Sequence, residues 1–140
     1  MQRFHRWGLT AGCLALAACA QTAEDRRQTE AIHRPAPGSN TMLVAPLETA
    51  DGLEVIVSDV FVPANQSAPF HSHPGEEFVY VIEGEAVHRE EGQEDRVYTA
   101  GEAFVIRKGR VHAPKTLDQP VRAIVFRVHV VGEPEQVPAP

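Results

Sequence analysis

Cysteine is scarce in this chain of 140 residues: the two present, Cys13 and Cys19, both lie close to its beginning. A domain folded from the residues beyond them has no thiol and can form no disulfide, even in an oxidising compartment. Long apolar runs are scarce too, because the apolar stretch at residues 7–18 is shorter than the ~20 residues that a membrane-spanning helix needs. We therefore expect the folded part to be stabilised mainly by an apolar core.

Basic residues are the minority among the charged ones, at 13 against 19 acidic residues, which gives a net charge of −6. Binding to nucleic acid needs clustered lysines and arginines that neutralise phosphates, so an acidic chain is a poor candidate for it. The same surplus of acid disfavours attachment to anionic lipid through surface charge. We therefore expect no nucleic-acid partner.

The first eighteen residues have the pattern of a signal peptide. Arg3 and Arg6 form a basic start, and an uncharged apolar stretch follows. The stretch Leu16-Ala-Ala-Cys19 resembles a bacterial lipobox, which implies cleavage before Cys19 and lipidation of that residue. The alternatives are an ordinary signal peptide cleaved nearby, a membrane anchor or a buried helix. Loss of Arg3 and Arg6 would lower the 13 basic residues to 11 against 19 acidic ones, a net charge of −8.

Composition divides the chain into four segments. Residues 1–18 are the expected lipoprotein signal peptide, and the polar, proline-containing residues 19–44 are expected to be a flexible tether. Residues 45–131 are expected to form one β-domain, and the proline-rich residues 132–140 a disordered tail. A lipid on Cys19 would hold the domain in the periplasm. Because Ala20 is not an aspartate, the outer membrane of a Gram-negative host is favoured over the inner membrane.

Short strands with turn residues between them fill the central segment. No part of it has helical spacing of its apolar residues. The pattern predicts an all-β fold, either a double-sheet jelly roll or a small barrel, and periodicity alone does not exclude an open sandwich. The expected strands are 53–62, 70–73, 78–83, 86–90, 97–98, 103–106, 111–113 and 121–131.

A group of imidazole and carboxylate side chains suggests a metal site. His71 and His73 are two residues apart, so on a strand both point to the same face. Pro74 and Gly75 then turn the chain and can return Glu77 to the same place. With His112 from a later segment, these side chains offer the ligands that first-row divalent metals favour. We expect the other histidines not to belong to the site: they are His5, His33, His88 and His129.

The spacing of these residues resembles the first motif of the cupin superfamily. That motif runs through His71, His73 and Glu77 to a glycine, here Gly84. The second cupin motif matches in part, at Gly101, Gly109 and His112. The resemblance extends over about residues 53–131 and implies a double-stranded β-helix, also called a jelly-roll barrel. It also implies one divalent transition metal (Mn, Fe, Ni, Co, Cu or Zn) bound by His71, His73, Glu77 and His112.

Three residues depart from the cupin motifs. Asn65 stands where a glycine is expected, Arg107 where a proline is expected, and Thr116 where an asparagine is expected. None is an expected metal ligand, so the departures concern the geometry of the loops. Arg107 also belongs to a basic loop with Arg110, and on an acidic protein this loop could attract an anionic substrate; the alternative is a solvated loop without a binding role.

Cupins include both enzymes and binding proteins, so fold alone does not decide the function. One hypothesis is a small dioxygenase-like metalloenzyme that acts on a small organic molecule. The alternative is a non-catalytic cupin that binds a metal or a small ligand. The residues that could serve as acid or base are weak candidates: they are Tyr80, Glu83, Glu85 and Tyr98. The resemblance also implies that the chain can form a homodimer.

Overall fold

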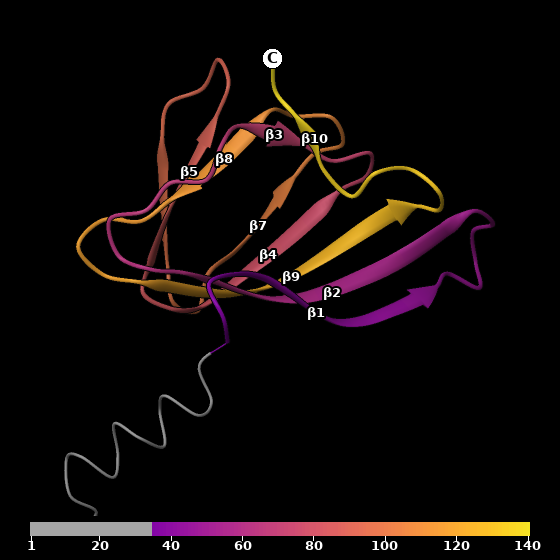
Figure 1. The fold of residues 1–140 in the computed structure, drawn as a ribbon, viewed down its shortest axis with the longest axis horizontal. Helices are drawn as coiled ribbons and strands as arrows, with labels where there is room; N and C mark the ends of the chain where they lie inside the picture. Colours follow the sequence, from indigo (N-terminus) through magenta and orange to yellow (C-terminus); the bar gives the residue numbers. More distant parts are fainter. Residues whose placement is uncertain (1–34) are drawn as a thin grey trace, which may run out of the picture. The chain divides into compact units, whose positions relative to one another are not determined.

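Antiparallel β-strands make up the part of the chain that the computed structural model describes, residues 35–140 (Figure 1). The expected signal peptide, Cys19 and the first part of the expected tether lie outside these residues. Within 35–140 no helix is long and apolar enough to cross a membrane. The strands are β1 (Gly38–Pro46), β2 (Leu53–Val62), β3 (His71–Ser72), β4 (Glu77–Glu83), β5 (Glu85–Glu90), β6 (Arg96–Thr99), β7 (Ala103–Ile106), β8 (His112–Lys115), β9 (Val121–Val130) and β10 (Val137–Pro138).

The strands form two five-stranded sheets. One sheet has the order β1-β2-β9-β4-β7 and the other β10-β3-β8-β5-β6. Alternate residues of β4 and β9 are buried, as expected for strands with one face on a core. The prediction of an all-β double-stranded β-helix is confirmed. The buried side chains form two clusters, one of Val79, Ile106, Ala123 and Val125 and the other of Val81, Ala86 and Val121.

Two of the departures from the cupin motifs have a structural explanation. Asn65 has a φ of 58° and is the one non-glycine residue among residues 35–140 with positive φ. Asparagine tolerates this left-handed conformation better than most residues, so it can replace a glycine here. The buried Thr116 hydroxyl accepts a hydrogen bond from the Gln66 amide (2.9 Å) and donates to the Pro63 carbonyl (2.6 Å). It therefore joins the loops after β2 and β8.

Both ends of the described chain differ from the expected segments. Part of the expected tether is strand β1, which pairs with β2 along its length. The expected disordered tail contains β10, which pairs with β3 through Val137 to Ser72 and Pro138 to His71. Composition suggested flexible ends, but each segment satisfies its backbone groups on a sheet edge that would otherwise be open. The tail is thereby brought next to the histidine-bearing strands.

Candidate metal centre

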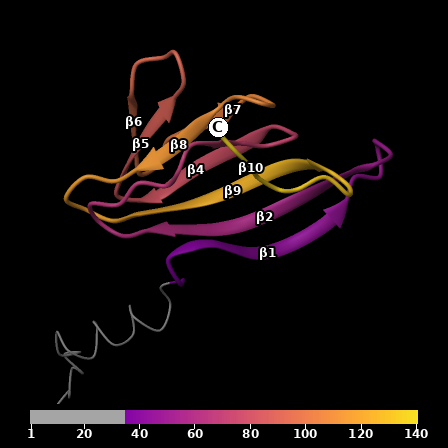
Figure 2. The ribbon, with the colours of Figure 1, turned by 45° about the horizontal axis from the view of Figure 1, so that its top comes forward.

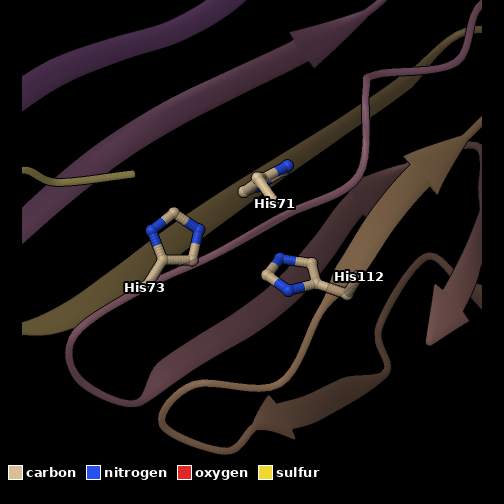
Figure 3. Close-up of side chains that lie close together, drawn as sticks. All are labelled: His71, His73 and His112. Atoms are coloured by element: carbon tan, nitrogen blue, oxygen red, sulfur yellow. The ribbon is translucent and has the colours of Figure 1, made fainter. Parts of the chain in front are cut away.

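Three histidines meet at one place between the sheets (Figure 3). His71 lies in β3 and is the register partner of His112 in β8, while His73 follows directly after β3. Ring centroids are 4.5 Å apart for His71 and His112, 4.9 Å for His71 and His73, and 5.3 Å for His73 and His112. One nitrogen from each ring lies within 4.8 Å of the other two. Three nitrogens that are each ~2.1 Å from one ion and evenly spread lie ~3.0–3.6 Å from one another, so the rings would move inward where they now stand farther apart.

The outer nitrogen of each ring is held by the backbone. Nδ1 of His71 donates to the Pro69 carbonyl (2.8 Å), and Nδ1 of His112 donates to the Arg110 carbonyl (3.0 Å). Nδ1 of His73 donates to the Glu135 carbonyl (2.5 Å). Because a carbonyl can only accept, each Nδ1 carries the proton, and in a neutral ring the lone pair is on Nε2. Such outer hydrogen bonds fix the tautomer and orientation of metal-binding histidines.

Burial keeps two of the rings neutral. It lowers the pKa of His71, and it lowers the pKa of His112 to about 4, in each case against the opposing effect of the backbone hydrogen bond. Neutral imidazole is the form that binds a metal. In addition, Nε2 of His73 is buried and faces Oε2 of Glu77 at 3.0 Å. Because Nδ1 carries the proton of a neutral ring, a lone pair and a carboxylate oxygen then face each other, and a bound metal would satisfy both. The three histidines therefore fit a divalent metal.

Glu77 lies at the margin of the three-histidine cluster. Its Oε2 is 3.0 Å from Nε2 of His73 and accepts a hydrogen bond from Nε of Arg127 (2.7 Å). Burial alone would raise the pKa of the Glu77 carboxyl, but His73 and the Arg127 guanidinium outweigh it and lower the pKa to about 2. Glu77 is thus a carboxylate at neutral pH, shared between a histidine and an arginine. Both contacts are made by Oε2, so a metal bound beside the histidines would either compete with Arg127 for that oxygen or bind Oε1.

An apolar cavity of about 250 Å³ opens beside the histidines. His71, His112 and Glu77 contribute to its wall, and His88 and Arg127 add the other ionisable groups that line it. Nε2 of His88 is 3.4 Å from Oε2 of Glu90, and the residue forms part of the cavity wall. The apolar part of the wall comes from both sheets and includes Val60, Val79, Ala86, Phe104, Ile106 and Val125.

The arginines predicted to bind substrate lie outside the cavity wall. Neither Arg107 nor Arg110 lines the cavity, and Arg110 donates to Glu90 (2.7 Å) at the surface. Their role in substrate binding stays a prediction. The backbone of their loop supports the site, because the Gly109 amide donates to the carbonyl of His73 (3.0 Å). Similarly, Tyr80, Glu83, Glu85 and Tyr98 do not line this cavity.

Sequence reasoning missed His88 and Arg127. His88 was expected to lie outside the site, yet it is buried and its ring centroid is 5.8 Å from that of His112. Its position two residues after the buried Ala86 was a usable indication, because both residues then face the same side of β5. Arg127 had a similar indication, because it is in phase with the buried Val121, Ala123 and Val125 of β9, but an arginine is usually exposed and was therefore not considered.

Comparison with known proteins agrees with this architecture. The family model described as "Cupin domain" matches residues 58–127. Dimethylsulfoniopropionate lyase DddQ from Ruegeria pomeroyi is 38% identical over 67 residues, which are 48% of this chain and 33% of the lyase. The chain thus spans about a third of the length of this curated relative.

Solved structures show the same fold. The crystal structure of dimethylsulfoniopropionate lyase DddQ from Ruegeria pomeroyi superposes with a TM-score of 0.55 at 28% identity, over 71% of this chain and 52% of the lyase chain. A cupin-like protein from Thermotoga maritima gives a TM-score of 0.59 at 19% identity, over 72% of this chain and 74% of the other. The two sheets, the motif residues and the family match lead to one conclusion: the chain belongs to the cupin family.

Proposed function

We propose that this cupin is a metal-dependent enzyme that acts on a small organic molecule held in the cavity between its sheets. The observation that carries this proposal is the convergence of three histidine nitrogens that could hold a metal beside an apolar cavity. Three histidines leave coordination positions for a substrate, unlike a closed structural zinc site with four protein ligands. The cavity volume of about 250 Å³ lies below the ~300–1,000 Å³ typical of pockets for drug-sized ligands, which favours a small substrate.

A lyase reaction is the form of this activity that we favour. The proposal draws on the relative named dimethylsulfoniopropionate lyase, with which the chain shares the segment that contains the cupin domain. Dimethylsulfoniopropionate carries a carboxylate at one end and a dimethylsulfonium at the other. When bound, the metal would act as a Lewis acid towards the carboxylate of such a substrate. Phe104 lines the cavity with one ring face stacked on Tyr98 (centroids 4.0 Å apart), and its other face would suit a sulfonium cation with its methyl groups.

Cleavage of such a substrate requires removal of a proton from the carbon next to the carboxylate. The electron pair of that C–H bond forms the new C=C bond, and the C–S bond breaks with its pair on sulfur, which gives acrylate and dimethyl sulfide. His88 is the group that we assign to receive the proton, because it lies in the cavity 5.2 Å from the Phe104 ring, measured between centroids. Glu90, next to Nε2 of His88, would orient the imidazole.

The test is a turnover assay with metal-reconstituted protein. Protein stripped with chelator and loaded separately with Mn²⁺, Fe²⁺, Co²⁺, Ni²⁺, Cu²⁺ or Zn²⁺ is incubated with dimethylsulfoniopropionate. We expect dimethyl sulfide by gas chromatography and acrylate by NMR in equal amounts, and neither product from His71→Ala. Oxygen uptake with phenols or organic acids, without dimethyl sulfide, would replace the lyase proposal by the dioxygenase one. Tight binding of these compounds without turnover would instead favour the non-catalytic alternative.

We also propose that Cys19 is lipidated and anchors the domain in the periplasm, with the outer membrane favoured. The basic start and the lipobox-like Leu16-Ala-Ala-Cys19 support this. Mass spectrometry of the membrane fraction should find an acylated peptide that begins at Cys19. A soluble mature form that begins at another residue would contradict it.

A homodimer is a further proposal. The exposed face of the first sheet carries Phe78 on β4 and its register partner Phe126 on β9, with Tyr80 beside them. Apolar side chains gathered on adjacent strands suit contact with a second copy of the chain. Sedimentation of the wild type as a dimer and of Phe78→Glu as a monomer would support this interface.

A further inference from the structure

The last eight residues, 133–140, lie across the histidine end of the barrel, and we call them the C-terminal strap. Their strand β10 adds to the edge of β3, and the Ala139 amide donates to the Phe70 carbonyl (3.0 Å). Figure 1 shows β10 beside β3, and Figure 2 shows the chain turning back from the end of β9 into β10. The strap therefore lies beside the strand that begins with His71 and directly precedes His73.

Within the strap, Glu135 makes two different contacts with the site. Its backbone carbonyl accepts the hydrogen bond from Nδ1 of His73, and its carboxylate Oε2 lies 3.3 Å from Nη1 of Arg127. Arg127 in turn donates through Nε to Glu77. We infer that Glu135 is a positioning residue of the metal centre, which orients His73 directly and Glu77 through Arg127. This inference rests on the proposed metal site.

Burial supports a positioning role over a role as ligand. The side chains of His73, Glu77 and Arg127 are only 4%, 9% and 10% exposed, whereas that of Glu135 is 51% exposed. Glu135 thus holds the inner groups from the outside. Without the strap, water would reach His73 and its Nδ1 would lose the acceptor that fixes the ring. Loss of such outer partners typically costs metal affinity by ~10–100-fold.

The two contacts of Glu135 can be separated by mutation. Glu135→Ala removes the carboxylate that pairs with Arg127 and leaves the backbone carbonyl in place. Truncation after Gly132 removes both contacts together. Glu133→Ala is a matched control, because Glu133 is an exposed acid of the same strap and its hydrogen bonds with His129 and Val130 are made by its backbone.

The experiment measures the release of Co²⁺, chosen because its visible absorption reports the ligand geometry. Each protein is loaded with Co²⁺, its spectrum is recorded, and release to excess EDTA is followed by loss of the absorption. We expect release about 10-fold faster from Glu135→Ala and ~10–100-fold faster from the truncated chain, each with a changed spectrum. Glu133→Ala should match the wild type. Should the truncated chain fail to fold, Glu135→Ala alone decides.

Wild-type release rates and spectra in Glu135→Ala would overturn the inference and leave the metal centre standing. Equal acceleration by Glu133→Ala and Glu135→Ala would also overturn it, because the effect would then be one of net charge. If the wild type bound no Co²⁺, the proposed metal centre would fall together with the inference. A changed spectrum is the decisive sign, since a general loss of stability does not alter the coordination of bound metal.

Discussion

Acidification from pH 7 to pH 5 should destabilise the metal-free protein, and His112 should be a main cause. Burial lowers the pKa of His112 from 6.5 to about 4. In this range the unfolded chain binds a proton at His112 and the folded chain does not. The free energy of unfolding therefore decreases as the pH decreases. The stabilisation is present above pH 6.5 and is lost progressively as the pH approaches 4.

The size of the effect follows from the two pKa values. Each unit of pKa difference is equivalent to 1.36 kcal/mol once His112 has titrated in both the folded and the unfolded chain. At pH 5 the pH lies about 1.5 units below the pKa of the unfolded chain, so about 1.5 units of the difference count. We therefore expect a loss of about 2 kcal/mol from His112 alone. His71 adds to the loss, because burial lowers its pKa as well. Glu77 adds little here, since its pKa is lowered to about 2 and the carboxyl of the unfolded chain titrates near 4.5.

The assay is urea unfolding of chelator-treated protein at pH 7 and pH 5. Unfolding is followed by circular dichroism, because the single tryptophan, Trp7, belongs to the expected signal peptide. His112→Gln cannot titrate at this position, so its free energy of unfolding should fall by about 2 kcal/mol less between the two pH values than that of the wild type. Equal pH dependence in both proteins would refute the assignment to His112.

Three further predictions concern metal binding, turnover and the loops. Metal at a hundredfold excess over its Kd should raise the free energy of unfolding by ~2.7 kcal/mol, and His71→Ala should abolish this response in thermal melts. His88→Gln should lower the rate of dimethyl sulfide release by ~10²-fold or more with unchanged metal content, measured by elemental analysis; a rate close to that of the wild type would exclude His88 as proton acceptor. Gly84→Ala should destabilise more than Gly92→Ala by ~1–3 kcal/mol in urea unfolding, because both have positive φ but only at Gly84 would the new Cβ meet the Pro120 carbonyl oxygen, at 2.0 Å. Equal losses in the two glycine variants would contradict the expected clash with Pro120.

Local pattern was sufficient to predict an all-β fold, and the resemblance to the cupin motifs added the double-stranded β-helix. The alternation of buried and exposed residues in β4 and β9 reflects one face on the core, and this can be read directly from the sequence. The two-residue spacing of His71 and His73 likewise indicated a shared face. In the structure these two residues meet His112, because β3 pairs with β8 at His71 and His112. Glycine and proline mark the turns between these segments in the sequence.

Only the tertiary structure decided which groups surround those histidines. His73 is held by Glu135, 62 residues later, and Glu77 is paired with Arg127, 50 residues later. Composition predicted a disordered tail because proline and glutamate are common there, but an open edge of β3 offers that segment backbone partners. Spacing along a chain records neighbours on one strand, whereas the acceptors that fix a histidine ring come from wherever the fold brings a carbonyl. The sequence thus determined the fold and the histidine cluster, and the tertiary contacts alone determined its outer partners.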